Sequence, residues 1–191
     1  MKMPQAKTLN TQELDKVLET VKWNKYPERD RIMILISFWS GMRVAEMASL
    51  KIGDVMGHDG NVKTEVRLKP EQTKGNRHRK VLLGEKLREE LVTYIKKLGR
   101  KDTHLPLIRS QQGDGYFIPN ALVQKFKSIY DQAGVFGAFS HSGRRTLITT
   151  LANKGTSVRV LQALAGHRHI GTTQMYIDVN EELMRQAIEN V

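Results

Sequence analysis

An apolar segment over residues 32–39 constrains the fold more than any other part of the chain. It reads Ile-Met-Ile-Leu-Ile-Ser-Phe-Trp, and Pro27 lies near the start of the helix that it predicts. A helix that is apolar on nearly every side is normally buried, so other elements must surround it. The run is far shorter than the ~18 apolar residues of a membrane span, and Gly41 ends it. The segment therefore predicts the central helix of a globular domain.

Helical periodicity predicts further elements on both sides of this segment. Asn10 followed by Glu13 is a capping-box pattern, and the apolar residues after it fall on one helical face as far as Val21. A short helix is expected over 44–50. Amphipathic helices are predicted at about 85–98, 120–133, 142–154 and 157–165, with shorter ones near 170–176 and 180–189. The chain is therefore expected to be mainly helical.

The middle of the chain has a strand-like pattern instead. Segments 51–55, 63–68 and 79–83 are predicted as strands, with a hairpin turn over 58–60 between the first two. A basic connection over 74–80 leads into the third. No linker is long enough to separate two domains. We therefore predict one domain over 1–191, of the α+β class and mainly α, with a small antiparallel β-sheet.

The composition favours a polyanionic partner and excludes several chemistries. Lys and Arg number 31 against 20 Asp and Glu, and this formal net charge of +11 favours nucleic acid through counterion release. The absence of cysteine excludes disulfides and thiolate metal sites. No P-loop is present, and His167 and His169 fall on different helical faces, so neither a metal nor a cofactor is expected. With no signal peptide or membrane segment, a cytoplasmic location is expected.

Cationic and nucleophilic side chains stand at the predicted ends of elements. They are Arg43, Lys74, His141, Arg144, His167 and Tyr176. Two guanidiniums can make forked hydrogen bonds to one phosphate. A tyrosine hydroxyl becomes a competent nucleophile beside cations that stabilise its phenolate. Together the set could cleave a phosphodiester without a metal, although each residue taken singly also fits a structural role.

The order of these residues resembles the tyrosine recombinases, also called the phage integrase family. Segment 40–50, SGMRVAEMASL, is similar to the family's T-G-x-R-x-x-E-x-x-x-L, and 141–146, HSGRRT, to its H-x-L-R-H/R-T box. Segment 165–176, AGHRHIGTTQMY, is similar to L-G-H-x-x-x-x-T-x-x-x-Y, and 73–83, TKGNRHRKVLL, to the hairpin that carries the family's lysine. The resemblance covers about residues 8–180 and implies a helical tyrosine-recombinase catalytic domain with a small sheet.

The resemblance also implies how the phosphate would be attacked. Arg43 and Arg144 would bind the scissile phosphate and stabilise its pentavalent transition state. Tyr176 would attack to form a 3′-phosphotyrosyl link and release a 5′-hydroxyl. Glu46, one turn after Arg43, would occupy the family's acidic support position and orient a neighbour such as His141.

The remaining implied roles concern protons and DNA contacts. Lys74 would be the general acid to the leaving oxygen, although neighbouring lysines leave the register of the hairpin open. His141 would assist proton handling, and His167 would donate a hydrogen bond to the phosphate. Gly143 replaces the family's leucine and is expected to loosen its helix. The side chains expected to contact DNA phosphates are Arg77, Arg79, Lys80, Arg145 and Arg168.

The resemblance implies a site-specific DNA recombinase, or integrase, that needs neither metal nor ATP. Its partners would be double-stranded DNA, a homotetramer on two DNA sites with the C-terminal segment packing in trans, and an accessory DNA-bending protein. Two alternatives remain: a DNA-binding regulator that does not cleave, and type IB topoisomerase-like nicking and sealing. The family's N-terminal clamp domain has no counterpart over 1–191, so both a short stand-alone integrase and an excised catalytic domain remain open.

Overall fold

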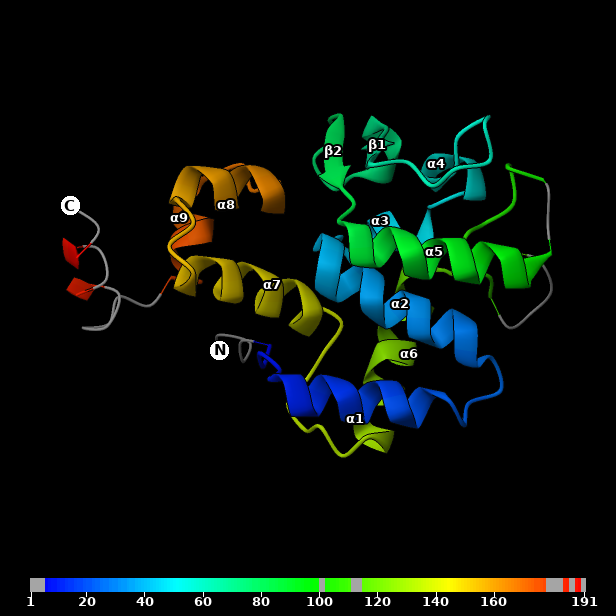
Figure 1. Ribbon diagram of the computed structural model, residues 1–191, viewed down its shortest axis with the longest axis horizontal. Coiled ribbons are helices and arrows are strands. Elements are labelled where there is room, and N and C mark those ends of the chain that lie inside the picture. The colour runs from blue at the N-terminus through cyan, green and yellow to red at the C-terminus, as the bar shows by residue number, and fades with distance from the viewer. Residues whose placement is uncertain (1–5, 100–101, 111–114, 178–183, 186–187, 190–191) are drawn as a thin grey trace.

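The computed structural model describes residues 6–99, 102–110, 115–177, 184–185 and 188–189, which are mainly helical (Figure 1). The helices are α1 (Thr11–Val21), α2 (Pro27–Ser40), α3 (Val44–Ala48), α4 (Ile52–Val55), α5 (Glu85–Leu98), α6 (Pro119–Gln132), α7 (Ser142–Asn153), α8 (Val158–Ala165) and α9 (Ile170–Gln174). The strands are β1 (Glu65–Leu68) and β2 (Arg79–Leu82), and a 3-10 turn, η1 (Pro70–Gln72), lies between them. The predicted class, mainly α with a small antiparallel sheet, is confirmed.

Helix α2 is the buried centre of the domain, as its apolar sequence predicts. The side chains from Ile32 to Ile36 are at most 2% exposed. Pro27 occupies the first turn, where its missing N–H costs nothing, and Gly41 caps the end with a φ of 61° that suits glycine. Helices α1, α3, α5 and α7 all contact α2 (Figure 1). The core therefore forms around this one helix.

The predictions for the first and middle segments have different outcomes. The capping box at α1 is confirmed, because the Asn10 side chain accepts the Glu13 N–H and Glu13 accepts the Asn10 N–H. The strand predicted over 51–55 is wrong: this segment forms the short helix α4, and Lys51 makes only an isolated bridge to Pro106. The helix predicted near 180–189 lies mainly outside the described residues.

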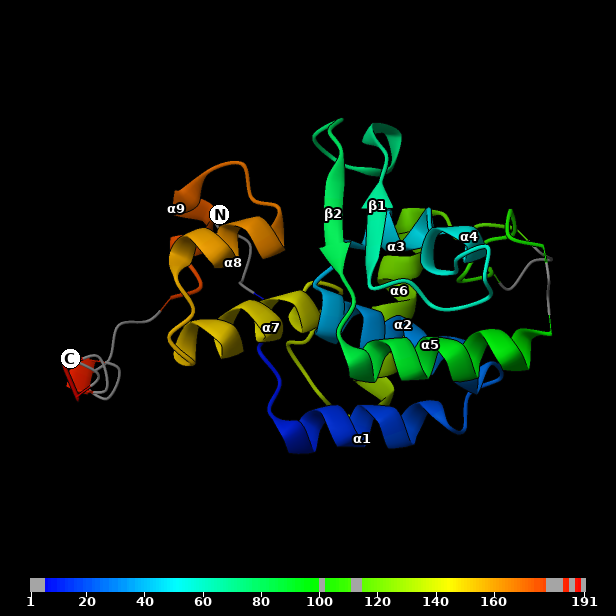
Figure 2. The same cartoon turned by 45° about the horizontal axis from the view of Figure 1, so that its top comes forward.

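The sheet is a single hairpin of two antiparallel strands. Its register runs from Glu65 opposite Leu82 to Leu68 opposite Arg79. The strands predicted over 63–68 and 79–83 are therefore confirmed in slightly shorter form. The hairpin and the α8–α9 pair lie on the same side of the domain, above α2 and α7 (Figure 2). This arrangement brings the basic connection over 74–80 toward the end of α8.

Helix α7 begins in unusually close contact with α2. A Cβ atom on Gly143 would lie 2.5 Å from the Ser37 Oγ and 2.8 Å from the Phe38 Cδ2. Real side chains do not approach so closely, so only glycine fits between the two backbones. The expectation that Gly143 loosens its helix is therefore wrong: the missing side chain lets α7 pack tightly on α2.

Candidate active site

Two arginines meet at the C-terminal end of α8. Arg144, in the first turn of α7, is 3% exposed; its Nη1 donates to the Gly41 carbonyl at 2.6 Å and its Nη2 to the Ala165 carbonyl. Arg43, the residue before α3, donates from Nη2 to the Gly166 carbonyl at 2.8 Å. The last carbonyls of a helix carry partial negative charge, so they attract guanidiniums. These contacts bring Arg43 and Arg144, which are far apart in the sequence, together at the end of α8, and we call this pair and its neighbours there the cationic cluster.

The carboxylate of Glu46 balances part of this positive charge. It is 1% exposed, and it accepts the Arg43 backbone N–H at 2.8 Å and the Arg43 Nη1 at 2.9 Å. The same carboxylate accepts the Nη1 of Arg79. The support role expected of Glu46 is thus directed, in this structure, at two arginines. These contacts fix the Arg43 guanidinium beside that of Arg144.

Burial and neighbouring cations act on the pKa values of the cluster. Burial, followed by the charges of Arg43 and Arg79, lowers the pKa of Arg144 to about 9, so its guanidinium is still charged at pH 7. Partial desolvation is also the largest cause that lowers the pKa of His141, although this residue is exposed at the surface, and the charges of Arg144, Arg43 and Lys74 follow. The pKa of His167 falls to about 4 for the same kind of reason. Both imidazoles are therefore neutral at pH 7, and each can donate one hydrogen bond and accept another.

The tyrosine predicted as nucleophile is packed against this cluster. Tyr176 follows α9, and its ring stacks on that of His167, with centroids 5.6 Å apart and planes inclined by 24°. The guanidinium carbon of Arg145 lies 5.3 Å from the centroid of the Tyr176 ring. The Nδ1 of His167 is 3.0 Å from the Thr173 Oγ1, and this hydrogen bond fixes the orientation of the histidine ring. The chain thus places an aromatic hydroxyl beside concentrated positive charge.

Lys74 lies at the exposed tip of the hairpin, near the rest of the cluster. The Thr73 Oγ1 accepts the Arg77 N–H at 3.1 Å and donates to the Arg77 carbonyl at 2.8 Å, which closes the turn around Lys74. The charge of Lys74 reaches His141, since it contributes to the lowered pKa of that imidazole. The charge of Lys74 thus acts on the same imidazole as the charges of Arg43 and Arg144.

The side chains expected to contact DNA divide into two groups. Arg77, Lys80 and Arg168 are exposed, although the Lys80 Nζ is 2.8 Å from a Glu65 carboxylate oxygen. Arg145 is partly buried over the tyrosine ring. Arg79 departs from the expectation: its side chain is 8% exposed and points inward, to Glu46. An arginine so enclosed is placed to hold the site together rather than to contact the backbone of DNA from the surface.

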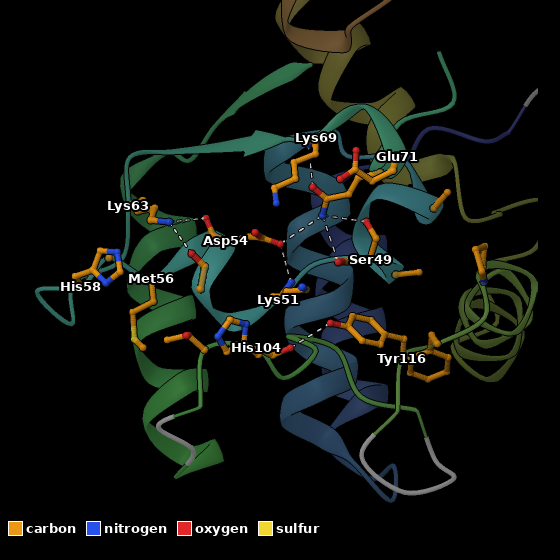
Figure 3. Close-up of a pocket in the computed structure, with 18 residues that line it drawn as sticks. Ser49, Lys51, Asp54, Met56, His58, Lys63, Lys69, Glu71, His104 and Tyr116 are labelled. Atoms are coloured by element: carbon orange, nitrogen blue, oxygen red, sulfur yellow. Dashed lines mark hydrogen bonds between the residues drawn. The ribbon is translucent and has the colours of Figure 1, made fainter. Parts of the chain in front are cut away.

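A cleft of about 730 Å³ is lined in part by residues of α3 and α4 (Figure 3). Its lining includes Lys51, Asp54, Lys69 and Tyr116, and none of the six site residues.

Within the described ranges, no three His, Asp or Glu side chains are grouped to hold a metal ion. No helix in the described part of the chain is long and apolar enough to cross a membrane.

Known proteins are similar to this chain in sequence and in fold. The model of the phage integrase family matches residues 7–182, and the chain therefore belongs to that family. The tyrosine recombinase XerA of Pyrococcus furiosus is 26% identical over 183 residues, which cover 96% of this chain and 61% of XerA. Among solved structures, a XerA recombinase covers 99% of this chain and 66% of its own, with a TM-score of 0.75 and 22% identity. A XerH recombinase bound to a palindromic difH substrate has a TM-score of 0.71 and 24% identity over 95% of this chain and 51% of its own. The chain spans about 60% of the length of the curated relatives it matches.

We expect His167 to titrate near pH 4 in the folded protein, well below the ~6.5 of an ordinary histidine. Because the folded state favours the neutral ring, the unfolded chain binds the extra proton first. This contribution to stability is therefore complete above pH ~6.5 and is lost as the pH falls toward 4. Histidine ring signals followed by NMR, with the urea-unfolded chain as reference, measure both values. A folded midpoint at or above that of the unfolded chain would contradict the burial of the ring among arginines.

Proposed function

We propose that the protein is a site-specific DNA strand transferase that cleaves and rejoins DNA through a 3′-phosphotyrosyl intermediate on Tyr176. The observation that carries the proposal is the convergence of Arg43 and Arg144 at the end of α8, next to the stacked rings of Tyr176 and His167. The names of the relatives support it, since the curated XerA is a tyrosine recombinase and the XerH structure holds a difH substrate after cleavage. Two forked guanidiniums fit the oxygens of one phosphate.

The proposed reaction exchanges one phosphodiester for another. The Tyr176 Oη attacks the phosphorus, so that an Oη–P bond forms while the bond from phosphorus to the 5′ oxygen breaks. The tyrosine proton passes to His141, whose lowered pKa leaves a nitrogen lone pair free at pH 7. Lys74 gives a proton to the departing 5′ oxygen, and a 5′-hydroxyl of another strand then reverses these steps. The energy of the phosphodiester is kept in the Tyr–P bond, so the exchange consumes no ATP.

The arginines act most strongly in the transition state of this reaction. Negative charge gathers on the non-bridging oxygens as phosphorus becomes pentavalent, and fixed donors in a partly dehydrated site stabilise it. Arg43 and Arg144 need no rearrangement to do so, because backbone carbonyls and Glu46 already hold them. His167, whose ring is stacked on that of Tyr176, contributes a neutral N–H donor to the phosphate.

We further propose that double-stranded DNA is the partner and that a homotetramer assembles on two DNA sites. The net charge of +11 and the exposed arginines Arg77 and Arg168 support binding to a polyanion. Near the C-terminus, Met184 and Ile188 are four residues apart and are 52% and 77% exposed. This spacing gives the tail an apolar face for a neighbouring protomer. An accessory DNA-bending protein is part of the same proposal.

A regulator that binds DNA without cleaving it fits the site less well. Such a protein needs surface cations, yet it has no use for a tyrosine whose ring is stacked on His167 and lies against the Arg145 guanidinium. Type IB topoisomerase-like nicking and sealing uses the same covalent chemistry, so the first experiment tests the covalent step that both share.

Trapping of the covalent intermediate tests the proposal. The substrate is a pool of duplexes of random sequence, each with a nick near a potential cleavage site. Cleavage then releases a short strand with a 5′-hydroxyl, and the loss of this strand prevents rejoining. We expect a protein–DNA adduct on a denaturing gel in EDTA and without ATP, with the DNA attached to the peptide that contains Tyr176. Sequencing of the trapped strands then identifies the preferred site. Retarded DNA on a native gel without any adduct, or attachment to another residue, would refute the proposal.

A further inference from the structure

Arg79 connects three elements that each carry a different part of the site. It begins β2, five residues after Lys74, and its guanidinium crosses to two other elements. The Nη1 donates to the Glu46 carboxylate on α3, and the Nη2 donates to the Leu164 carbonyl on α8 at 3.0 Å. The side chain is 8% exposed and packs so closely on Gly166 that a Cβ atom there would lie 2.6 Å from its Nε.

Among the described residues, few side chains attach the turn that carries Lys74 to the rest of the domain. Before the turn, the Gln72 Nε2 lies 3.3 Å from the Ser49 carbonyl and 3.4 Å from the Asp54 Oδ2, where Figure 3 draws these contacts. After the turn, Arg79 is the side chain that reaches α3 and α8. The turn itself is closed by the hydrogen bonds between Thr73 and Arg77 and by the Asn76 N–H, which donates to the Thr73 carbonyl at 3.1 Å, and the sheet has two strands. The place of the Lys74 ammonium therefore depends on how firmly β2 is held.

We propose that Arg79 is a positioning residue that holds the hairpin so that Lys74 reaches the leaving 5′ oxygen. The inference rests on the proposed function. A guanidinium suits this task because two separate nitrogens reach two acceptors in fixed directions. Glu46 links Arg79 to Arg43, and Leu164 lies three residues before His167, so one side chain sets the hairpin against both halves of the phosphate site.

A substrate with sulfur in place of the scissile 5′ oxygen separates this role from a general structural one. A thiolate leaves without being protonated, because a thiol has a pKa of about 8.5, far below that of an alcohol. Cleavage of such a substrate no longer needs the proton of Lys74, but it still needs Tyr176 and the arginines. We expect Arg79→Met to cleave the oxygen substrate about 100-fold more slowly than wild type, the scale of a general acid. On the sulfur substrate its rate should lie within about 3-fold of wild type, because the protonation step is bypassed.

Single-turnover rates with saturating nicked duplex, of a sequence recovered from the trapped pool, give both numbers. Lys74→Met serves as the reference for direct loss of the acid and should show the same contrast between substrates. Arg77→Met, which removes an exposed arginine from the same hairpin, is the charge-matched control and should slow both substrates equally. Arg79→Lys keeps a positive charge beside Glu46 and should show the contrast in weaker form, even where Arg79→Met folds poorly.

The outcomes of this experiment are distinct. An equal slowing of both substrates by the two Arg79 variants would overturn the inference, since Arg79 would then act on the phosphate clamp or on the fold as a whole. The inference would also fail if Arg77→Met showed the same contrast as Arg79→Met. Failure of the wild-type protein to form an adduct with either substrate would instead refute the proposed function. Recovery on the sulfur substrate alone supports the positioning role.

Discussion

Tyr176→Phe is expected to abolish the covalent adduct while leaving DNA binding within about 2-fold of wild type. The change removes one oxygen atom, which is the proposed nucleophile, so cleavage should fall by more than about 10⁴-fold. The phenylalanine ring can keep the stack on His167, at 5.6 Å between centroids, and the contact with Arg145 at 5.3 Å. Fold and phosphate site should therefore survive, and native and denaturing gels run on the same reactions measure binding and capture separately.

The matched control for this substitution is Tyr116→Phe. Tyr116 lines the separate cleft, and its hydroxyl donates to the His104 carbonyl at 3.2 Å. It lies outside the cationic cluster, so capture should continue at the wild-type rate. An adduct that persists in Tyr176→Phe would mean that another residue is the nucleophile. A collapse of DNA binding in that variant would mean that Tyr176 serves mainly to dock DNA.

Most residues of the candidate site could be predicted from the sequence, because their spacing along the chain indicates where helices begin and end. Arg43 follows the glycine that ends α2, and His141 and Arg144 share the first turn of α7. The structure adds what spacing cannot contain, namely that these helix starts meet the carbonyls at the end of α8. Arg43 and Gly166, for example, are more than one hundred positions apart in the sequence. Such contacts depend on how the whole core packs.

The wrong strand over 51–55 has a local cause. Residues 51–55, Lys-Ile-Gly-Asp-Val, are too few for a clear period, and the apolar residues Ile52 and Val55 are three apart, as on one helical face. The decisive feature is Asp54, whose Oδ2 accepts the Lys51 N–H at 2.8 Å and closes that turn. An acidic residue three positions after a potential helix start is a signal that could have predicted this helical turn.

The inward direction of the Arg79 side chain could also have been predicted in part from the sequence. In a strand, alternate side chains share a face, so Arg79 shares its face with Val81, which is 2% exposed. Lys80 belongs to the opposite face and is exposed. A basic run by itself favours contact with phosphate, whereas the strand pattern identifies which of its members faces the core. The buried partner, Glu46, cannot be identified from sequence because α3 is brought to the hairpin by the fold.

We expect Gly143→Ala to lower the free energy of unfolding by about 2–3 kcal/mol, the upper part of the ~1–3 kcal/mol that overpacking of a tight interior costs. The new Cβ atom would lie 2.5 Å from the Ser37 Oγ and 2.9 Å from the Ser37 carbonyl carbon. Part of this obstacle is backbone of the central helix, which cannot rotate away, so α7 must move from α2. Urea unfolding followed by circular dichroism measures the loss, and leucine, the residue expected from the family pattern, should cost more than alanine.

Gly171→Ala is the control that separates crowding from the loss of a glycine. Gly171 is also helical, and a Cβ atom there would meet only the Gln174 Oε1, at 3.9 Å. Alanine at that place should leave stability within about 1 kcal/mol or raise it, because alanine favours the helix. Equal losses in the two variants would mean that α7 and α2 are not in close contact. The crowded variant should also cleave DNA poorly even where it is folded, because α7 carries Arg144, and a shift of α7 would draw its guanidinium away from the Gly41 carbonyl, now at 2.6 Å.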